Sequence, residues 1–412
     1  MALTINHQTN DISATSGSMT IDGSAVGGGG ASSNVDTGNF IGGTGAGAGL
    51  QSGGDYNTLL GQQAGNDITT GDYNTVVGYN ALSKNQTGGY NVAIGHLAGE
   101  EYTFSESVFI GRNAGKERST GNLNIGIGKN SNAGFSSTLA TGNENVGVGT
   151  NTIARVTYGT YNAAFGGTAG FNVTTGTHNN LFGYLAGYNI TTGNNNTCIG
   201  NQAGRSATTS NYLTAIGYGS LYSTTGGYNV AYGAESGYDV STGEYNTIIG
   251  HQAANSGTND LTSGSNNTLI GYQSAASSSS VSNEITLGNS SISSLRCQVQ
   301  TISSLSDERD KTNIEPLQAG LDFVERLKPV SFTWNMRDGG KVGIEETGFI
   351  AQDLQQVQQE TGINIPNLVF DENPERLEAS YGTLVPALVQ AIKDLSLKVN
   401  DLEAQVKAQG EK

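Results

Sequence analysis

The chain has 412 residues, of which 61 are glycine and only 35% are hydrophobic, and its formal net charge at neutral pH is −16. The glycine share is about twice the average of roughly 7%, which argues against a conventional globular core. Charged residues make up only 13%, which argues against charge-driven disorder. The negative charge would repel nucleic-acid phosphates, and no apolar run approaches the ~18 residues of a membrane span. We therefore expect an ordered, non-globular protein that binds no nucleic acid and does not insert into a membrane.

Residues 1–50 precede any clear repeat. The opening stretch, MALTINHQTNDISATSG, has neither the basic start nor the apolar core of a signal peptide. This predicts assembly in a cytoplasm. The run GGTGAGAG at 42–49 predicts a flexible neck after a short adaptor.

Residues 51–291 carry an internal repeat of the form N-x-x-Φ-G, where Φ is apolar. Fourteen copies follow one another, and most successive anchor glycines are 17 apart, as Gly78 is from Gly61, while a few are 16 or 21 apart. A fixed short period predicts a solenoid, in which each unit buries its apolar surface against its neighbours. The anchor glycines are Gly61, Gly78, Gly95, Gly111, Gly128, Gly149, Gly166, Gly183, Gly200, Gly217, Gly233, Gly250, Gly271 and Gly288.

Two further positions recur in every copy, and a third recurs in most of them. An apolar residue precedes the anchor glycine, as in Ile94, and a small residue follows it by three places, as in Ala98. We expect the apolar residues to form an inward stripe of stacked strands. An asparagine four places before most anchors suits turns and side-chain ladders. Helix is disfavoured because glycine, threonine and asparagine are weak helix formers.

This repeat is similar to the head repeats of trimeric adhesins of the YadA type and to repeats in phage fibres. The resemblance rests on the N-x-x-Φ-G unit and the small residue after it, although the period here is longer. It implies a mainly β fold, in which each chain forms a parallel β-roll and three chains pack around one axis.

The composition changes near residue 300. All five prolines and the only tryptophan, Trp334, follow residue 305, together with 30 of the 54 charged residues but only 8 of the glycines. We therefore expect a connector at 292–305 and a separate domain at 306–412.

The last part of that domain, from about residue 381, carries a heptad seam. Its apolar residues alternate at spacings of three and four, which predicts a coiled-coil helix of about three heptads. A single amphipathic helix folded back on its own domain is the alternative. The seam residues are Val385, Leu388, Ile392, Leu395, Val399, Leu402 and Val406.

The domain opens with the run SDERDK at 306–311. This run resembles the S-D-x-R-x-K signature that opens the intramolecular chaperone domain of endosialidases and of many phage fibres and spikes. The stretches LKPVSFTWN at 327–335 and GFIAQD at 348–353, and the closing helix, extend the resemblance. It implies a small α/β domain that trimerises, aligns three fibre chains, and is released by autoproteolysis.

The resemblance also implies the roles of single residues. Ser306 would be the nucleophile that cuts the Leu305–Ser306 bond, Lys311 would be its base, and Asp307 and Arg309 would be supporting residues. A serine hydroxyl needs a neighbour that takes its proton, and a partly desolvated lysine can do so. Any enzymatic activity would then be at most a single-turnover serine peptidase acting on its own chain.

A separation of five residues puts Ser306 and Lys311 on neither one helical face nor one strand face. The pair would therefore meet in a loop or across chains. The alternative for the whole run is a solvated turn that caps the following helix, because serine and aspartate are common caps.

Cofactors and metals are not expected. Cys198 and Cys297 lack partners at metal-ligand spacing and are interpreted as buried or free thiols. His96 and His251 each follow an anchor glycine, so a trimer axis could gather three copies of each around a metal. Surface imidazoles are the favoured interpretation.

Together these features predict a phage tail fibre or spike: a structural component of the virion for host attachment. Its expected partners are two further copies of the chain, a tail or baseplate protein at one end, and a host cell-surface glycan or protein receptor. A glycan-degrading spike is one alternative, but no repeat presents a recurrent pair of carboxylates. A bacterial trimeric surface adhesin is the other.

Overall fold

The computed structural model describes residues 3–6, 11–14, 20–21, 24–25, 38–101, 104–117, 120–134, 141–257, 259–296, 298, 306–337, 341–371 and 373–410. The chain divides into two compact units, Met1–Gly288 and Asn289–Lys412. The predicted end of the repeats at residue 291 lies just beyond this division. Within the predicted adaptor, β1 (Leu3–Asn6) pairs antiparallel with β2 (Asp11–Ala14), and β3 (Thr20–Ile21) with β4 (Ser24–Ala25).

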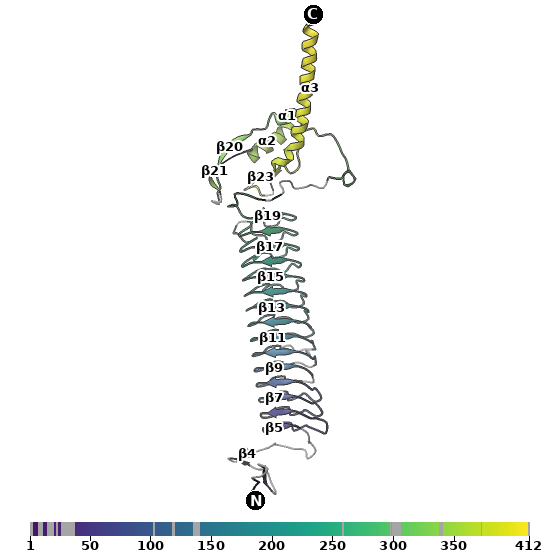
Figure 1. The fold of residues 1–412 in the computed structure, drawn as a ribbon, viewed down its shortest axis with the longest axis vertical. Coiled ribbons are helices and arrows are strands. Elements are labelled where there is room, and N and C mark those ends of the chain that lie inside the picture. Colours follow the sequence, from purple (N-terminus) through teal and green to yellow (C-terminus); the bar gives the residue numbers. More distant parts are fainter. Residues whose placement is uncertain are drawn as a thin grey trace. The chain divides into compact units, whose positions relative to one another are not determined.

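The first unit is a parallel β-solenoid. One three-residue strand from each coil joins a single sheet of 15 strands, in which neighbours in sequence are neighbours in space (Figure 1). The predicted repetitive β fold is confirmed. The strands are β5 (Phe40–Gly42), β6 (Thr58–Leu60), β7 (Thr75–Val77), β8 (Val92–Ile94), β9 (Val108–Ile110), β10 (Ile125–Ile127), β11 (Val146–Val148), β12 (Ala163–Phe165), β13 (Asn180–Phe182), β14 (Thr197–Ile199), β15 (Thr214–Ile216), β16 (Val230–Tyr232), β17 (Thr247–Ile249), β18 (Thr268–Ile270) and β19 (Ile285–Leu287).

The solenoid begins one coil earlier than predicted. Strand β5 pairs in register with β6, and it lies within residues 1–50, which were expected to form an adaptor and a glycine-rich neck. Gly43 has a φ of +127°, which matches the later anchor glycines. The repeat pattern misses this coil because Gly42 takes the apolar place before the anchor. The run at 42–49 is therefore an ordered part of the first coil.

The solenoid core is formed by the middle residue of each strand. Leu181 and Ile248, for example, are fully buried, and so is the small residue three places after each anchor from Gly61 to Gly271, such as Ala186. The predicted inward stripe is wrong, because side chains alternate along a strand. In such a short strand only the middle residue points inward, so the residue before the anchor points outward; Ile199 is 40% exposed.

The anchor glycines are required by the stacking of the coils. From Gly61 to Gly271 their φ angles lie between 125° and 138°, a region that is essentially restricted to glycine. The backbones also approach closely at this corner. A Cβ placed on Gly95 would lie 2.6 Å from the carbonyl oxygen of Gly111 in the next coil. Both the conformation and the space therefore exclude a side chain.

The predicted asparagine ladder is confirmed. The Oδ1 of Asn162 accepts hydrogen bonds from the backbone N–H of Asn179 at 3.1 Å and from its Nδ2 at 2.9 Å. The same Nδ2 donates to the carbonyl of Gly193 at 2.9 Å, and Asn179 repeats the pattern toward Asn196. These side chains are fully buried or nearly so. The ladder thus satisfies buried backbone groups at the corner just before each strand begins.

Coil length varies without disturbing the sheet. The two longest anchor spacings follow Gly128 and Gly250, yet the strands on either side, β10–β11 and β17–β18, pair over their full length. The order of the spacings also recurs, since the anchors from Gly61 to Gly166 are spaced in the same way as those from Gly183 to Gly288. A block of seven coils therefore occurs twice.

The second unit is small and mixed. It contains the 3₁₀ turn η1 (Glu308–Asp310), α1 (Leu321–Val324), the antiparallel pair β20 (Val330–Asn335) and β21 (Val342–Gly348), α2 (Ala351–Thr361), the pair β22 (Val369–Phe370) and β23 (Glu378–Ala379), η2 (Tyr381–Leu384) and α3 (Val385–Gly410). Its core gathers α1, α2 and the start of α3 around Phe323, Leu354, Leu368 and Ala387. Elsewhere the unit is largely exposed.

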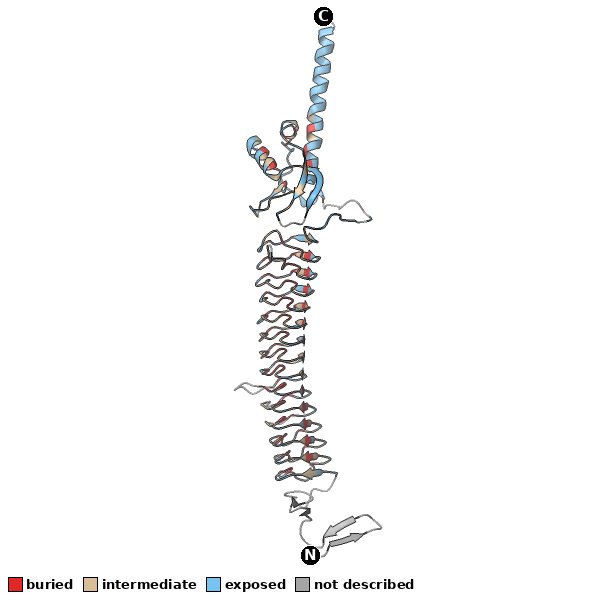
Figure 2. Ribbon diagram, turned by 90° about the vertical axis from the view of Figure 1, so that its left-hand side faces the viewer, coloured by how far each residue is buried: buried red, intermediate tan, exposed pale blue. Residues whose placement is uncertain are grey.

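Helix α3 is attached to this core only by its first turns. Ala387 and Ala391 are its buried residues, and Figure 2 shows the rest of the helix exposed. The predicted helix and its seam are confirmed as local structure, with the seam residues from Val385 to Val406 all at least 43% exposed. Within this chain the seam is not folded back against the unit.

Candidate functional site

The run at 306–311 folds around the single turn η1. Asp307 caps the turn, with its Oδ1 accepting the backbone N–H of Arg309 at 2.9 Å. Lys311 ends it in an extended conformation, with its own N–H bonded to the carbonyl of Glu308 at 3.1 Å. The solvated turn that was the alternative interpretation of this run is therefore present, as a 3₁₀ turn.

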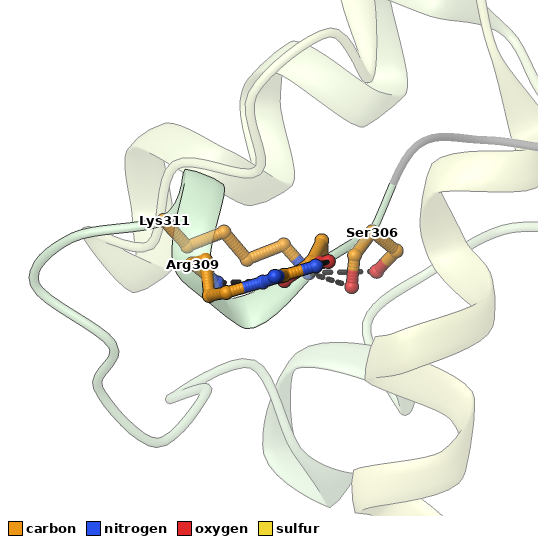
Figure 3. A network of polar contacts seen from close by, with 4 residues as sticks. Ser306, Arg309 and Lys311 are labelled. Carbon is orange, nitrogen blue, oxygen red and sulfur yellow. Dashed lines mark hydrogen bonds and ion pairs between the residues drawn. The ribbon is translucent and has the colours of Figure 1, made fainter.

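This turn brings Ser306 and Lys311 together. The Nζ of Lys311 donates to the Oγ of Ser306 at 2.6 Å and to its carbonyl oxygen at 3.2 Å, as Figure 3 shows. One tight turn with extended residues on both sides reverses the chain, so that two side chains five residues apart meet. Of the two arrangements left open by the sequence, the contact here forms in a loop of one chain.

Asp307 and Arg309 form a fork beside this pair. Arg309 donates through Nε at 3.0 Å to Oδ1 and through Nη2 at 2.5 Å to Oδ2. These hydrogen bonds from the guanidinium lower the pKa of Asp307, and the carboxylate in turn raises the pKa of Arg309. The fork stabilises the turn and holds Asp307 ionised, but neither side chain contacts Ser306 or Lys311 through a described hydrogen bond.

Water reaches the whole arrangement. Ser306, Asp307, Arg309 and Lys311 are all exposed in the single chain. A lysine amine acts as a base only when neutral, and desolvation is what favours the neutral form. Leu305, which would supply the acyl side of the cut bond, lies outside the described residues. The geometry thus provides the hydroxyl and the amine at hydrogen-bonding distance, in a solvated environment.

Residues 306–363 match the protein-family model described as the chaperone of endosialidase. The resemblance noted from the sequence is thereby confirmed for this segment, which runs from Ser306 through η1 and the β20–β21 pair to the end of α2. Residues 364–412, including α3, lie beyond the match.

Two curated proteins are similar over a short length. The chain is 33% identical over 101 residues to the long tail fiber protein Gp37 of Enterobacteria phage K3, and equally to that of Enterobacteria phage T2. The alignment covers 24% of this chain but only 8% and 7% of those proteins. The chain therefore spans less than a tenth of the relatives it matches. The chain is thus similar in part to a chaperone domain of endosialidase and in part to phage long tail fibre proteins.

No solved structure matches the chain. Among the described helices, none combines the length and apolar character needed to cross a membrane.

His96, His251 and Cys198, which were also singled out in the sequence, lie in the solenoid. His96 stacks on Tyr79, with ring centroids 5.4 Å apart, and His251 stacks on Tyr272 at 5.6 Å. Cys198 is a buried free thiol in strand β14, and burial raises its pKa to about 12. Cys297 lies outside the described residues. Each of these imidazoles therefore stacks on a tyrosine ring of a neighbouring coil.

One polar contact of the second unit was not foreseen. The carboxylate of Asp394, on α3, accepts the backbone N–H of Leu321 at 3.0 Å and so caps α1. The two residues are 73 positions apart, and a lone aspartate in a helix carries no local signal for such a contact. It joins α3 to the part of the unit that follows the Ser306 site.

Proposed function

We propose that the chain is a phage tail-fibre or spike component whose C-terminal unit assembles three copies and then cuts itself off between Leu305 and Ser306. The main support for this proposal is the 2.6 Å contact between Lys311 Nζ and Ser306 Oγ, within a segment that matches the endosialidase chaperone family. The solenoid would be the fibre shaft that remains in the virion.

The cleavage step follows from the chemistry of the two groups. The Oγ of Ser306 attacks the carbonyl carbon of Leu305 while Lys311 takes the hydroxyl proton. The peptide C–N bond breaks as the proton passes to the departing amide nitrogen of Ser306, which leaves an ester between Leu305 and the Ser306 side chain. One water molecule then hydrolyses the ester and regenerates the serine hydroxyl. Each chain is cut once.

The trimerisation step is supported by the exposed seam of α3. Seven apolar residues at heptad spacing project from a helix that is otherwise attached only at its start, and such a seam is stabilised by packing against other helices. About three heptads form a marginal coiled coil alone, so the rest of the unit would help to hold the copies together.

Cutting would depend on assembly. Lys311 is exposed in the single chain, whereas a base of this kind works when water is partly removed from it. Packing of neighbouring copies over the 306–311 turn would supply that change. Cleavage by chains held as verified monomers would contradict this dependence.

The test compares the full-length wild type with Ser306→Ala and Lys311→Met variants on denaturing and native gels. The wild type is expected to yield two fragments, 1–305 and 306–412, and both variants an intact chain. Arg337→Met is a matched control, since it removes an exposed basic side chain elsewhere in the same unit, and it should leave cleavage unchanged.

A wild-type chain that is trimeric but uncut would refute the proposed self-cleavage and would still support the assembly role. Cleavage that persists in Ser306→Ala would refute the assigned nucleophile.

Attachment to a host is the wider role that we propose. A shaft of this kind would join a tail or baseplate protein at one end and carry the contact with a cell-surface glycan or protein at the other. Binding of purified virions, with and without this protein, to host envelope fractions tests that role. Equal binding by both would contradict it.

A further inference from the structure

The sheet of the solenoid has an outward side without charges, on which the third strand positions are apolar from β6 to β19 and the first positions are apolar, threonine or asparagine. We call it the strand face: the side chains at the first and third positions of strands β5–β19. The third positions are the most uniform, with leucine, valine, isoleucine, phenylalanine or tyrosine in every strand from β6 to β19. Several are substantially exposed, among them Ile127, Phe182, Ile249 and Ile270 at 37–39% and Tyr232 at 59%.

No charge interrupts this face. None of the residues in strands β5–β19 is charged, although the chain as a whole carries 54 charged residues. Charged pairs of the solenoid, such as Lys84 with Glu101, lie on other parts of the coils. Contiguous apolar surfaces of this extent are rare on proteins that remain single, and they mark surfaces of association.

The strand face is also the part of the coil that changes least. Short, regular and long coils all present strands of one length in unbroken register, so the extra residues are accommodated elsewhere. The first and third positions of the strands are therefore presented in columns along fifteen strands.

The uniformity of the face identifies what covers it. A partner that packs along all the strands must present its own side chains at the inter-strand spacing of about 4.8 Å. A second copy of this chain has that spacing in every coil and carries the same uncharged face. A chain without such a period would match only a few coils at a time.

We infer that the strand face is the surface through which the solenoids of neighbouring copies pack, with β5–β19 of each chain directed toward the others. This inference rests on the proposed assembly of three copies and adds the surface that the shafts use. It also explains why exposed apolar residues stand where the repeat pattern had predicted an inward stripe.

Cross-linking of the full chain tests this surface. One variant carries Ile199→Cys, at a third position of the strand face, and its matched control carries Thr192→Cys, exposed at another corner of the preceding loop. Both are made with Cys297→Ser, while the native Cys198 can stay because it is buried and its raised pKa leaves little reactive thiolate. A short bismaleimide is the probe, and light scattering reports the number of copies. A preserved β signal in circular dichroism confirms folding.

We expect most of the Ile199→Cys chain to migrate as a covalent two-copy product and the Thr192→Cys chain to remain a single band. A trimer in which Ile199→Cys stays single and reacts freely with a thiol reagent would overturn the assigned surface but leave the assembly intact. A chain that remains monomeric at all concentrations would overturn the assembly as well. Cross-linking at both positions alike would also contradict the inference.

Discussion

The solenoid and the C-terminal unit differ in what a single chain provides for each. In the solenoid, the middle residues of strands β6–β18 are buried in the core, and in most coils the asparagine ladder pairs buried polar groups. In the C-terminal unit, a small core holds the first turns of α3 and leaves the apolar seam beyond it exposed. Under the proposed assembly, neighbouring copies would cover the outside of the solenoid sheet and the exposed seam of α3. This difference fits the proposal that the C-terminal unit assembles the solenoids into a shaft.

The largest expected effect comes from removing the surface by which the C-terminal unit finds its partners. Ile392→Glu places a charge in the seam of α3, where Ile392 is 68% exposed, so the single chain should still fold. Three buried charges in the assembly would be strongly unfavourable. We expect loss of the trimer by light scattering. Leu397→Glu is the matched control, because Leu397 is 64% exposed on the same helix but lies off the seam, and it should assemble normally.

Within the solenoid, the stacking corner should be the most sensitive point. Gly95→Ala places a methyl group 2.6 Å from the carbonyl of Gly111 at a φ of +135°. We expect a loss of about 3–5 kcal/mol in the free energy of unfolding, measured by denaturant titration. In Gly53→Ala the φ is also positive but no atom lies within 4 Å, so about 1 kcal/mol is expected. Equal losses would show that the close approach between coils is unimportant.

The asparagine ladder should have a somewhat smaller effect. Asn179→Ala removes the acceptor for the N–H and Nδ2 groups of Asn196 and the donor to Gly193, all buried. Unpaired buried groups of this kind cost about 2–4 kcal/mol together. Thr175→Ala, at an exposed site of the same coil, should change stability by less than about 0.5 kcal/mol. Hydrogen exchange of the Asn196 amide distinguishes a lost bond from general unfolding.

The smallest expected effect concerns pH and the C-terminal unit. Hydrogen bonds from the Leu321 N–H and from Gln390 lower the pKa of Asp394 below its ordinary value of 3.8. A lowered carboxyl pKa contributes stability above about pH 4, and this contribution is lost as pH falls through the lower folded value. The unit should therefore lose stability below about pH 4 less steeply in Asp394→Asn than in the wild type. The measurement is an acid titration of both proteins followed by the helix signal in circular dichroism. Curves of equal steepness for the wild type and Asp394→Asn would contradict this role.

Much of this organisation could be predicted from the sequence because its signals are local and repeated. The near-constant spacing of the anchor glycines predicts the solenoid, the heptad spacing predicts α3, and SDERDK predicts the pair of Ser306 and Lys311. The outward direction of the apolar residues before the anchor glycines could not be predicted. Periodicity alone does not say which of two alternating strand positions faces the core. The first coil was missed because Gly42 replaces the apolar residue. The capping of α1 by Asp394 depends on tertiary packing between residues far apart.

The most direct test of the account is the mass of the assembled, uncut protein. Native mass spectrometry of the full-length Ser306→Ala chain, each copy having a mass of 42.5 kDa, reports how many copies the C-terminal unit has brought together. The account predicts a species of three chains that persists on dilution, and its loss in the same chain carrying Ile392→Glu. A species of one chain, or a trimer that Ile392→Glu leaves unchanged, would contradict the claim that α3 assembles the fibre.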